Sequence, residues 1–546
     1  MQDVLVIFAF FIILLSIVIA LIKDLSSWVY ITILLAIASW LLLFPQILSP
    51  YVVGIDAHFE HIIAEETLRT GHWDPDLSGN IVNAALSITI LTPFISIVSG
   101  IPLDWVLKII LTIYPLISIP IIWKSNIHIL SFSNRESFLS LLLLIGTSSF
   151  MLISVYGRQE VGLFSGLVLL YFLHFKKSSV QLSIVLIFLV IGLIFSHYST
   201  AIILIITYAI SSLFLYLFQR DKCSMRLVLF SIVFMVFWLI LIVYASMASI
   251  SHSFNFIYLS ILDWATENSS IVVEQQLNPT FYNIFQSLNY VINIFIIIFL
   301  VIGTSYLVYS RVVKSKLESE ENKKYFIFAF LSSIYILLSV LPGFSSVYNA
   351  ERIYLTTLYL FSGFSLIGFK RVFVYIVTFF TKFSPIYLKK SNKYIFVVFS
   401  FFVLVHFVLQ VGILPMLYYG DTNSKYFGDI SEDRHYTLEE EVYAVNWLQG
   451  INNNNRIYTD FYGRGRLPLR SYGNIPTSQI VDLKEIGPTT LNLRNIIFYQ
   501  QKKELNDEVS SKNFEQIEEI NNFLQKYGST LYNSGMTEVK VINLNS

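Results

Sequence analysis

The sequence contains few charged residues and a single cysteine. Lys, Arg, Asp and Glu make up 13% of its 546 residues, about half of their share in a soluble globular protein. Cys223 is the only cysteine, so no disulfide bond can form within the chain. The formal net charge is zero, which by itself indicates no particular partner, and nothing in the sequence predicts binding to nucleic acid.

Apolar residues make up 55% of the chain and gather in long runs. A run of about 20 apolar residues is typical of a helix that crosses a membrane. The first run lacks the basic stretch and the cleavage site of a signal peptide, so we expect it to be retained as a span. The longest runs are Val4–Ile22, Trp28–Leu48, Val180–Phe195, Ala201–Phe218, Leu227–Tyr244, Val291–Val308 and Tyr394–Leu414.

The distribution of basic residues predicts which loops face the cytoplasm. Loops rich in Lys and Arg stay on the cytoplasmic side of a membrane. The loops between them are Tyr156–Glu160, Ser196–Thr200, residues 246–283 and Leu341–Arg352, and we expect these on the outer face. The sequence therefore predicts a multi-pass protein of the plasma membrane.

The segment Ile81–Ser99 is apolar but contains Asn83 and Pro93. If it crossed the membrane, every later basic loop would face outward, against the expected sidedness. We therefore interpret it as a re-entrant or surface-lying segment and assign the span to Pro102–Trp123. This places the loop of residues 49–80 outside and gives a mainly α, polytopic helical protein with roughly twelve spans.

The character of the chain changes near residue 420. Residues 1–420 form the predicted membrane domain, and residues 421–546 are polar. Helical patterning at Thr437–Leu448 and strand-like pieces at Arg456–Thr459 and Val539–Ile542 predict a small α/β domain. We expect this C-terminal domain to be extracytoplasmic.

The densest group of acids, bases and histidines lies between Gly54 and Asp76. The spacing predicts a helix over Ala57–Thr70 that is amphipathic, with His58 and His61 on its polar face and suited to lie along the membrane. Asp56 precedes this helix at the expected N-cap position. A capping carboxylate accepts a backbone N–H bond, and its second oxygen remains available for chemistry, so the two roles are compatible.

A metal site in this region is an open alternative. The HExxH spacing of a zinc protease is absent. A hard divalent ion, Mg or Mn, bound by carboxylates from two separate loops is compatible with the residue types. The candidate ligands are Asp56, Glu160, His58 and Glu60.

Further charged groups lie at the predicted outer ends of spans. Arg158 and Glu160 form either an orienting pair or a ligand site, and His197 either caps backbone groups or binds a phosphate or hydroxyl. Lys108 either extends to the surface or binds an anion. Arg352 can donate paired hydrogen bonds to a phosphate.

Carboxylates and cations on one face of a membrane suit one reaction in particular. Transfer of a sugar from a polyprenyl phosphate to a hydroxyl needs a carboxylate that takes the acceptor proton. The leaving phosphate must be stabilised by cations or a metal. The lipid tail needs a groove between spans, and Ile81–Ser99 is a candidate wall of that groove.

This layout resembles the GT-C superfamily of polytopic glycosyltransferases. Gly-Ile-Asp-Ala-His-Phe-Glu at Gly54–Glu60 resembles the first outer-loop acidic motif of that superfamily, and Glu160 resembles its second acidic position. The resemblance implies that Asp56 is the catalytic base or a metal-binding carboxylate. Further segments resemble uncharacterised prokaryotic and archaeal members, distant from protein mannosyltransferases and oligosaccharyltransferases. These are Ser196–Thr200, Ala350–Ile353, Glu439–Leu448 and Tyr532–Glu538.

The sequence departs from the superfamily pattern at three points. The first motif follows the second apolar run, the second motif reads Arg-Gln-Glu instead of paired acids, and the tail has no WWD-type sequence. The second departure weakens the expectation of a metal. The third argues against an oligosaccharyltransferase that acts on sequons.

We therefore predict a glycosyltransferase that uses a polyprenyl-phosphate sugar, contacts membrane lipids, and modifies a cell-envelope glycan, lipid or protein. Asp56 and Glu160 are the expected catalytic residues, and Arg352, His197, Lys108 and Arg158 the expected phosphate-binding residues. One alternative is a polysaccharide polymerase or ligase of another membrane fold, which depends mainly on outer-loop Arg and His. Another is a transporter or flippase of lipid-linked glycans, which needs polar groups at mid-membrane.

Overall fold

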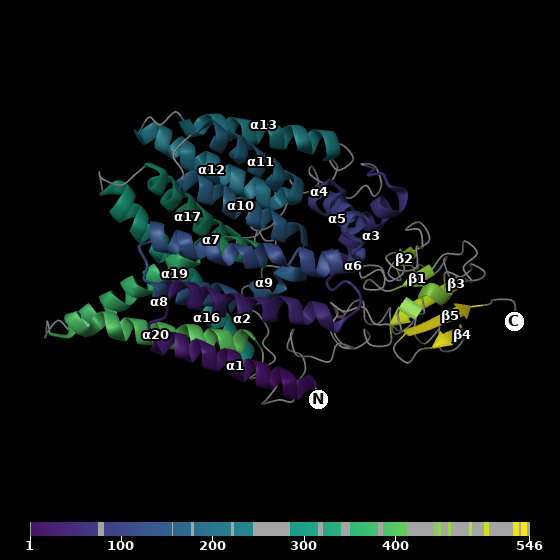
Figure 1. Ribbon diagram of the computed structural model, residues 1–546, viewed down its shortest axis with the longest axis horizontal. Coiled ribbons are helices and arrows are strands. Elements are labelled where there is room, and N and C mark those ends of the chain that lie inside the picture. The colour runs from purple at the N-terminus through teal and green to yellow at the C-terminus, as the bar shows by residue number, and fades with distance from the viewer. Residues whose placement is uncertain are drawn as a thin grey trace, which may run out of the picture. The chain divides into compact units, whose positions relative to one another are not determined.

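A computed structural model gives the structure of the protein (Figure 1). The predicted loop of residues 246–283, Asp76 and Tyr156 lie outside the described residues. The chain divides into two compact units, and each is considered by itself. The described residues are 2–74, 81–155, 157–175, 179–219, 223–243, 284–314, 320–339, 350–380, 386–411, 442–443, 445–448, 457–459, 480–482, 496–501, 528–533 and 537–542.

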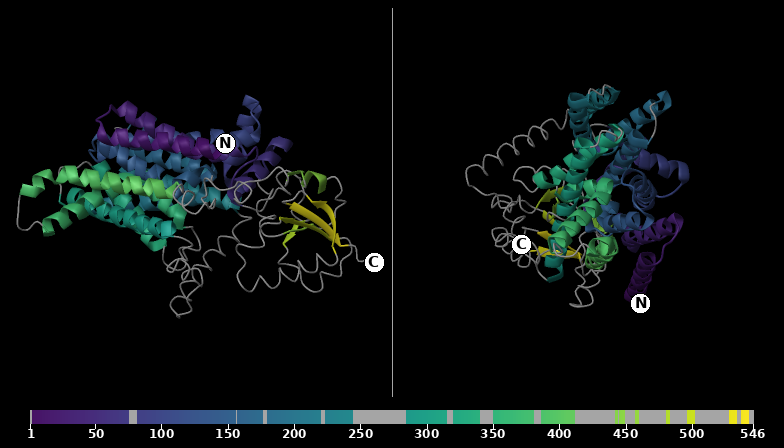
Figure 2. Two further views of the ribbon diagram at one scale, coloured as in Figure 1. Left: turned by 90° about the horizontal axis from the view of Figure 1, so that it is seen from below. Right: turned by 90° about the vertical axis from the view of Figure 1, so that its left-hand side faces the viewer.

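The first unit, the helical unit, comprises Met1–Phe44, Asp74–Ile88 and Ile109–Phe427. Its long helices lie side by side with nearly parallel axes (Figures 1 and 2). They are α1 (Gln2–Ile22), α2 (Ser27–Leu48, whose last turn belongs to the second unit), α7 (Ile113–Ile129), α8 (Asn134–Ile145), α10 (Gly157–Phe175), α11 (Val180–Ser196), α12 (Tyr198–Gln219), α13 (Cys223–Val243), α16 (Ile284–Leu307), α17 (Glu320–Ser339), α19 (Ala350–Phe380) and α20 (Ile386–Gln410). Short helices join them: η1 (Ile81–Ala84), α4 (Leu86–Thr89), α9 (Ser148–Met151), η3 (Leu152–Val155) and η5 (Val308–Val313).

Among the described residues, 5 helical stretches are long and apolar enough to cross a membrane. They are Ser27–Ile47, Leu103–Ile129, Tyr198–Leu217, Ser287–Val313 and Arg352–Phe379. Shorter apolar helices, including Val180–Ser196 and Tyr394–Gln410, accompany them. The total of about twelve spans stays a prediction.

The doubtful segment Ile81–Ser99 is not one continuous helix. It consists of η1, α4 and α5 (Leu91–Ser99), with breaks at Ala85 and Ile90. The next candidate span begins at Leu103, where the sequence placed it. The interrupted backbone agrees with the interpretation that Ile81–Ser99 does not cross the membrane as a straight helix.

Two glycines set the closest helix contact of the helical unit. A Cβ atom added at Gly303 on α16 would overlap the carbonyl oxygen of Phe364 on α19. A Cβ added at Gly368 on α19 would overlap the carbonyl oxygen of Phe299 on α16. Small residues at such crossings allow the two backbones to approach, as in other membrane bundles. This contact fixes α19, the helix that carries Arg352.

The second unit comprises Pro45–Trp73, Thr89–Lys108 and Gly428–Ser546. Its helix α3 (Ile55–Thr70) packs against α5 and against α6 (Leu103–Trp105). Its five-stranded sheet has the order β2-β1-β3-β5-β4, with parallel pairs among the first three strands and antiparallel pairs after them. The strands are β1 (Ile457–Thr459), β2 (Ile480–Asp482), β3 (Ile496–Gln501), β4 (Gly528–Asn533) and β5 (Thr537–Ile542). Strands β1 and β5 lie where the sequence pattern predicted strands.

Candidate functional site

Helix α3 begins at Ile55, two residues earlier than predicted. Its N-cap is Gly54, with φ 109°, a conformation that glycine adopts without the strain a side chain would introduce. Asp56 therefore lies in the first turn, and the expectation that it caps the helix is wrong, because no side-chain cap bond is formed there. A carboxylate in a first turn is stabilised by the helix dipole. Asp56 is partly exposed.

The polar side of α3 is buried, although an amphipathic helix that lies along the membrane would expose this side to solvent. His58 is 1% exposed, Glu60 is 1% exposed and His61 is 3% exposed. The Nε2 atom of His61 lies 3.1 Å from Oδ1 of Asp104 on α6. This contact ties the middle of α3 to α6, because buried polar groups are stable only when they find partners.

Lys108 is buried and does not extend to the surface as the sequence allowed. Its side chain is 1% exposed, and its Nζ donates a hydrogen bond to the carbonyl oxygen of Ser49. The ammonium also lies 4.7 Å from the centre of the Trp105 ring and is attracted by Asp104. Lys108 is thus an internal contact of the second unit.

In the helical unit, the predicted outer turn at residues 156–160 is the start of α10. Arg158 is 7% exposed, Gln159 is 1% exposed and Glu160 is 0% exposed. Buried charges in a membrane protein are costly and mark functional positions far more often than random ones. The sequence identified Arg158 and Glu160 but gave no signal for Gln159.

His197 lies between α11 and α12 and is 2% exposed. The backbone N–H of Thr200 donates to its Nδ1 at 3.4 Å, and Thr200 Oγ1 lies 2.6 Å from the same atom. Because a backbone N–H only donates, Nδ1 accepts, and we infer that the neutral ring carries its proton on Nε2. Nε2 lies 3.3 Å from Oγ of Ser199.

The protonation state of His197 is set by its surroundings. Burial, together with the positive charges of Arg158 and Arg352, holds the pKa of His197 well below its ordinary value. The ring is therefore neutral near pH 7. Helix α10 touches this turn directly, since a Cβ added at Gly162 would lie 2.9 Å from Cβ of His197.

Four of the residues that the sequence proposed as site residues are related here: Arg158 and Glu160 share the first turn of α10, which lies against the turn of His197, and Arg352 acts electrostatically on His197. We call this group the anion cluster. The cations of Arg158 and Arg352 both act on His197. Glu160 lies within electrostatic range of two tyrosines that sequence reasoning missed, Tyr114 on α7 and Tyr359 on α19. Nothing in the spacing of the tyrosines distinguished them from the 31 others of the chain's 33.

The expected metal ligands are divided between the two units. Asp56, His58 and Glu60 belong to the second unit, and Glu160 belongs to the helical unit. Among the described residues, no group of three or more His, Cys, Asp or Glu side chains is arranged to hold a metal ion. The side chains that the structure describes therefore do not fit a closed metal site.

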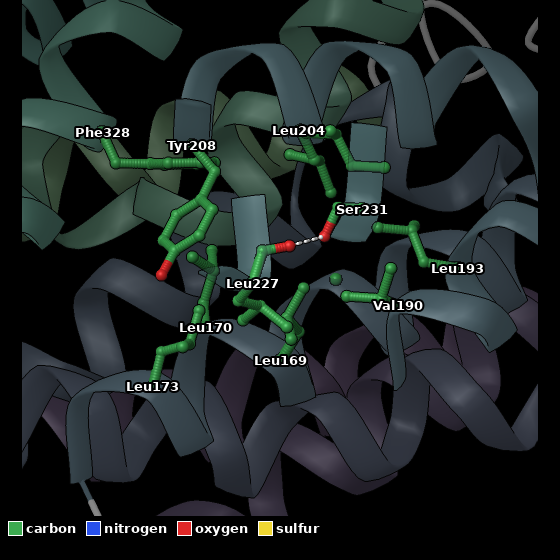
Figure 3. A pocket seen from close by; sticks show the side chains of 12 residues that line it. Leu169, Leu170, Leu173, Val190, Leu193, Leu204, Tyr208, Leu227, Ser231 and Phe328 are labelled. Atoms are coloured by element: carbon green, nitrogen blue, oxygen red, sulfur yellow. Dashed lines mark hydrogen bonds between the residues drawn. The ribbon is translucent and has the colours of Figure 1, made fainter. Parts of the chain in front are cut away.

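An apolar pocket lies further along α10 from the anion cluster. It is lined by α10, α11, α12, α13 and α17. Leucines such as Leu169, Leu170 and Leu193 surround it (Figure 3). Its Ser231 hydroxyl donates to the carbonyl oxygen of Leu227 at 2.7 Å and so offers little polarity to the pocket (Figure 3). Such a lining suits a hydrocarbon chain.

Comparison with known proteins gives a family and a fold. Residues 182–527, more than half of the chain, match the family described as "Predicted membrane protein (DUF2206)". The chain belongs to this family. No curated protein matches the sequence.

Solved structures resemble the whole chain. The apo crystal structure of the Archaeoglobus fulgidus oligosaccharyltransferase aligns with TM-score 0.54 and 11% identity over 96% of this chain and 76% of that one. AglB of the same archaeon, in complex with an inhibitory peptide and a dolichol-phosphate, aligns with TM-score 0.52 and 11% identity over 95% and 74%. ArnT from Cupriavidus metallidurans, bound to undecaprenyl phosphate, gives TM-score 0.46 and 11% identity over 96% and 99%. The A. fulgidus structures show that the family member described here has a GT-C-type membrane fold, as the sequence predicted.

Proposed function

We propose that the protein is a glycosyltransferase that moves a sugar from a polyprenyl-phosphate donor to a hydroxyl of a cell-envelope glycan, lipid or protein on the outer face of the membrane. The observation that supports this most is the anion cluster: the first turn of α10, with the buried Arg158 and Glu160, lies against the turn of the buried His197 inside a GT-C-type helical unit, and Arg352 acts electrostatically on the same histidine. Fold alone does not define function, and the cluster supplies the chemical argument.

The cluster is suited to bind a phosphate. Two arginines that act on the same buried histidine favour the binding of an anion there. Guanidinium groups form paired hydrogen bonds with phosphate oxygens, and the Nε2–H of a neutral His197 is a further donor. In this proposal Arg158, Arg352 and His197 hold the donor phosphate, and Glu160 orients the arginines.

The reaction then follows from the chemistry of a sugar phosphate. The acceptor oxygen attacks the anomeric carbon, the bond between that carbon and the phosphate oxygen breaks, and polyprenyl phosphate leaves. Asp56 takes the acceptor proton as general base. The cations stabilise the negative charge that develops on the leaving phosphate. Lys108 stays a weaker prediction as a phosphate ligand, since Ser49 and Trp105 already engage its amine.

The apolar pocket supports a lipid-linked donor. It is lined in part by α10, whose first turn carries Arg158 and Glu160 of the anion cluster, and its apolar side chains suit an isoprenoid chain. The similar fold of AglB has been captured with a dolichol-phosphate. No step is proposed through a metal ion, because the described carboxylates and histidines do not converge.

A reconstituted assay tests the proposal. Full-length protein in lipid vesicles is given a panel of polyprenyl-phosphate hexoses and an envelope extract, and release of polyprenyl phosphate is measured. We expect release by the wild type, a large loss in Asp56→Asn, and no change in Asp74→Asn, an exposed carboxylate used as control.

Three outcomes separate the alternatives. Release that survives in folded Asp56→Asn removes the base and favours a polymerase or ligase that depends on Arg and His. No release by the wild type, combined with movement of the lipid-linked sugar across the vesicle membrane, favours a flippase. Release that is seen with the wild type and with Asp74→Asn but collapses in Asp56→Asn supports the transferase.

A further inference from the structure

Gln159 is buried beside the anion cluster and has not been given a role. Its side chain is 1% exposed. Within the part of the chain that the structure describes, neither Nε2 nor Oε1 has a hydrogen-bond partner. Native proteins keep few buried polar groups in this state, because an unsatisfied amide loses its bonds to water without replacement. A ligand that completes both atoms is the simplest reason to retain glutamine here.

The position of Gln159 on α10 gives its direction. Residues three and seven positions apart share one face of a helix, so Gln159 lies on the face of Gly162 and Gly166. That face meets α12 and the turn before it. A Cβ added at Gly162 would lie 2.9 Å from Cβ of His197, and one added at Gly166 would lie 2.5 Å from Cδ1 of Leu204. Gln159 is therefore on the side of α10 that faces His197.

The chemistry of an amide discriminates between possible ligands. Nε2 donates and Oε1 accepts. Phosphate oxygens only accept at neutral pH and would complete Nε2 alone. Sugar hydroxyls both donate and accept, so they complete both atoms. The cations that suit a phosphate are supplied by the adjacent Arg158, which leaves the amide for the neutral part of the same donor.

We infer that Gln159 is a sugar-binding residue that hydrogen-bonds a hydroxyl group of the donor sugar and selects hydroxylated sugars over their deoxy counterparts. This inference rests on the proposed transferase function. It names the class of donor: a hexose with a free hydroxyl at the position that meets Gln159. A site built around a hydroxyl rejects analogues that lack it, because the protein's own polar atoms are then left unsatisfied.

The test pairs a protein change with a substrate change. Wild type, Gln159→Met and the control Gln181→Met, an exposed glutamine of α11, are reconstituted at full length. The kcat/KM of each is measured with the best polyprenyl-phosphate hexose and with its monodeoxy analogues. We expect the wild type to lose at least about tenfold on one deoxy donor. On the parent donor, the kcat/KM of Gln159→Met should fall below that of the wild type by about the same factor. On the deoxy analogue, the kcat/KM of Gln159→Met should be no lower than its value on the parent donor.

Such non-additivity is not produced by a purely structural role. If Gln159→Met lowers kcat/KM equally for all donors and keeps the preference for the hydroxylated sugar, Gln159 is a packing residue and the inference is overturned. If Gln159→Met does not fold, Gln159→Asn, which keeps the amide one methylene shorter, must show the same loss of preference. If the wild type releases polyprenyl phosphate from none of the sugar donors, the proposed transferase function itself is wrong. That result differs from an unchanged sugar preference in Gln159→Met, which overturns only the role of Gln159.

Discussion

Helices α8 and α10 of the same bundle both begin with charged residues, but these residues have different partners in the two helices. At the start of α8, Ser133 and Glu136 form a capping box, and Glu136 accepts from the Ser133 N–H at 2.7 Å. Lys370 of α19 also donates to Glu136. At the start of α10, by contrast, Arg158 and Arg352 bring two positive charges to one neutral His197. Beside them Gln159 is buried without a partner among the described residues.

The difference shows that buried charge alone does not mark a functional site. The start of α8 joins opposite charges and satisfied caps, which is how a protein stabilises a helix end. The start of α10 buries Arg158 and Glu160 beside His197, and next to them an amide that has no hydrogen-bond partner among the described residues and that a ligand would complete. Removal of a charge at the start of α8 should therefore lower stability and leave the reaction rate unchanged, whereas removal of a charge from the anion cluster should lower the reaction rate.

The largest effect is expected from the arginine that α19 contributes to the anion cluster. We expect Arg352→Ala to lower the rate of polyprenyl-phosphate release by about 100- to 1000-fold, because a donor to the developing phosphate charge is lost. The measurement is the initial rate in vesicles, together with the melting temperature in detergent.

Arg371→Ala is the matched control on the same helix. Arg371 is exposed and stacks on the Tyr306 ring at 3.7 Å. Its loss should leave the rate unchanged. A large loss of rate in both variants would show that α19 as a whole, and not the anion cluster, is sensitive to substitution.

The next effect concerns the distance between α10 and His197. In Gly162→Ala the added methyl would lie 2.9 Å from Cβ of His197, so α10 or the His197 turn must shift. We expect the rate to fall by about tenfold to a hundredfold, because small displacements of binding groups weaken catalysis strongly. Gly192→Ala, whose Cβ would lie 3.9 Å from Oγ of Ser165, should have no effect. Equal rates in Gly162→Ala and Gly192→Ala would show that the position of His197 does not affect the reaction.

The sequence predicted much of this arrangement because its signals are local. Long apolar runs predicted helices such as α12 and α16, and the distribution of basic loops predicted that Ile81–Ser99 does not cross the membrane as an ordinary span. Arg158, Glu160, His197 and Arg352 were identified because charged residues are rare near membrane spans. The sequence grouped them in one site together with Asp56 and Lys108, but it could not predict which of them lie next to His197, since that depends on how α10, α12 and α19 pack.

The errors of sequence reasoning have the same origin. The sequence left Lys108 either extending to the surface or binding an anion, and tertiary packing instead brings Ser49 and Trp105 to its amine. Asp56 was expected to cap α3, but Gly54, with its positive φ, starts the helix earlier. Gln159 was overlooked because glutamine is ordinary in sequence, and only its burial makes it unusual.

A smaller effect is expected from pH. His197 has a lowered pKa in the folded protein, whereas in the unfolded chain it binds a proton below about pH 6.5. The unfolded state then binds more protons, so stability falls as pH falls below that value, by about 1.4 kcal/mol per pH unit. His197→Asn should flatten the pH dependence of the melting temperature between about pH 6.5 and 5. His72→Asn, at an exposed position, should leave it unchanged. An identical slope in wild type and His197→Asn would mean that His197 is not held neutral.

The smallest effect is expected at the start of α8. Burial alone would raise the pKa of Glu136, but hydrogen bonds from Lys370 and Ser133 outweigh it and lower that pKa below its ordinary value. Glu136 therefore stabilises the fold above about pH 4.3, and this contribution is lost as pH falls further. Glu136→Gln should lower the free energy of unfolding at pH 7 by about 1–2 kcal/mol and leave the rate unchanged.

Glu66→Gln provides the comparison for that substitution. It breaks the exposed ion pair with Arg69, whose Nη2 lies 2.6 Å from Oε1 of Glu66, and exposed pairs contribute little stability. We expect no measurable change in the melting temperature. If Glu136→Gln instead abolished the rate while leaving stability intact, the start of α8 would be as functional as the start of α10. The two positive charges that act on His197 and the unsatisfied amide of Gln159 would then no longer distinguish the anion cluster from an ordinary helix cap.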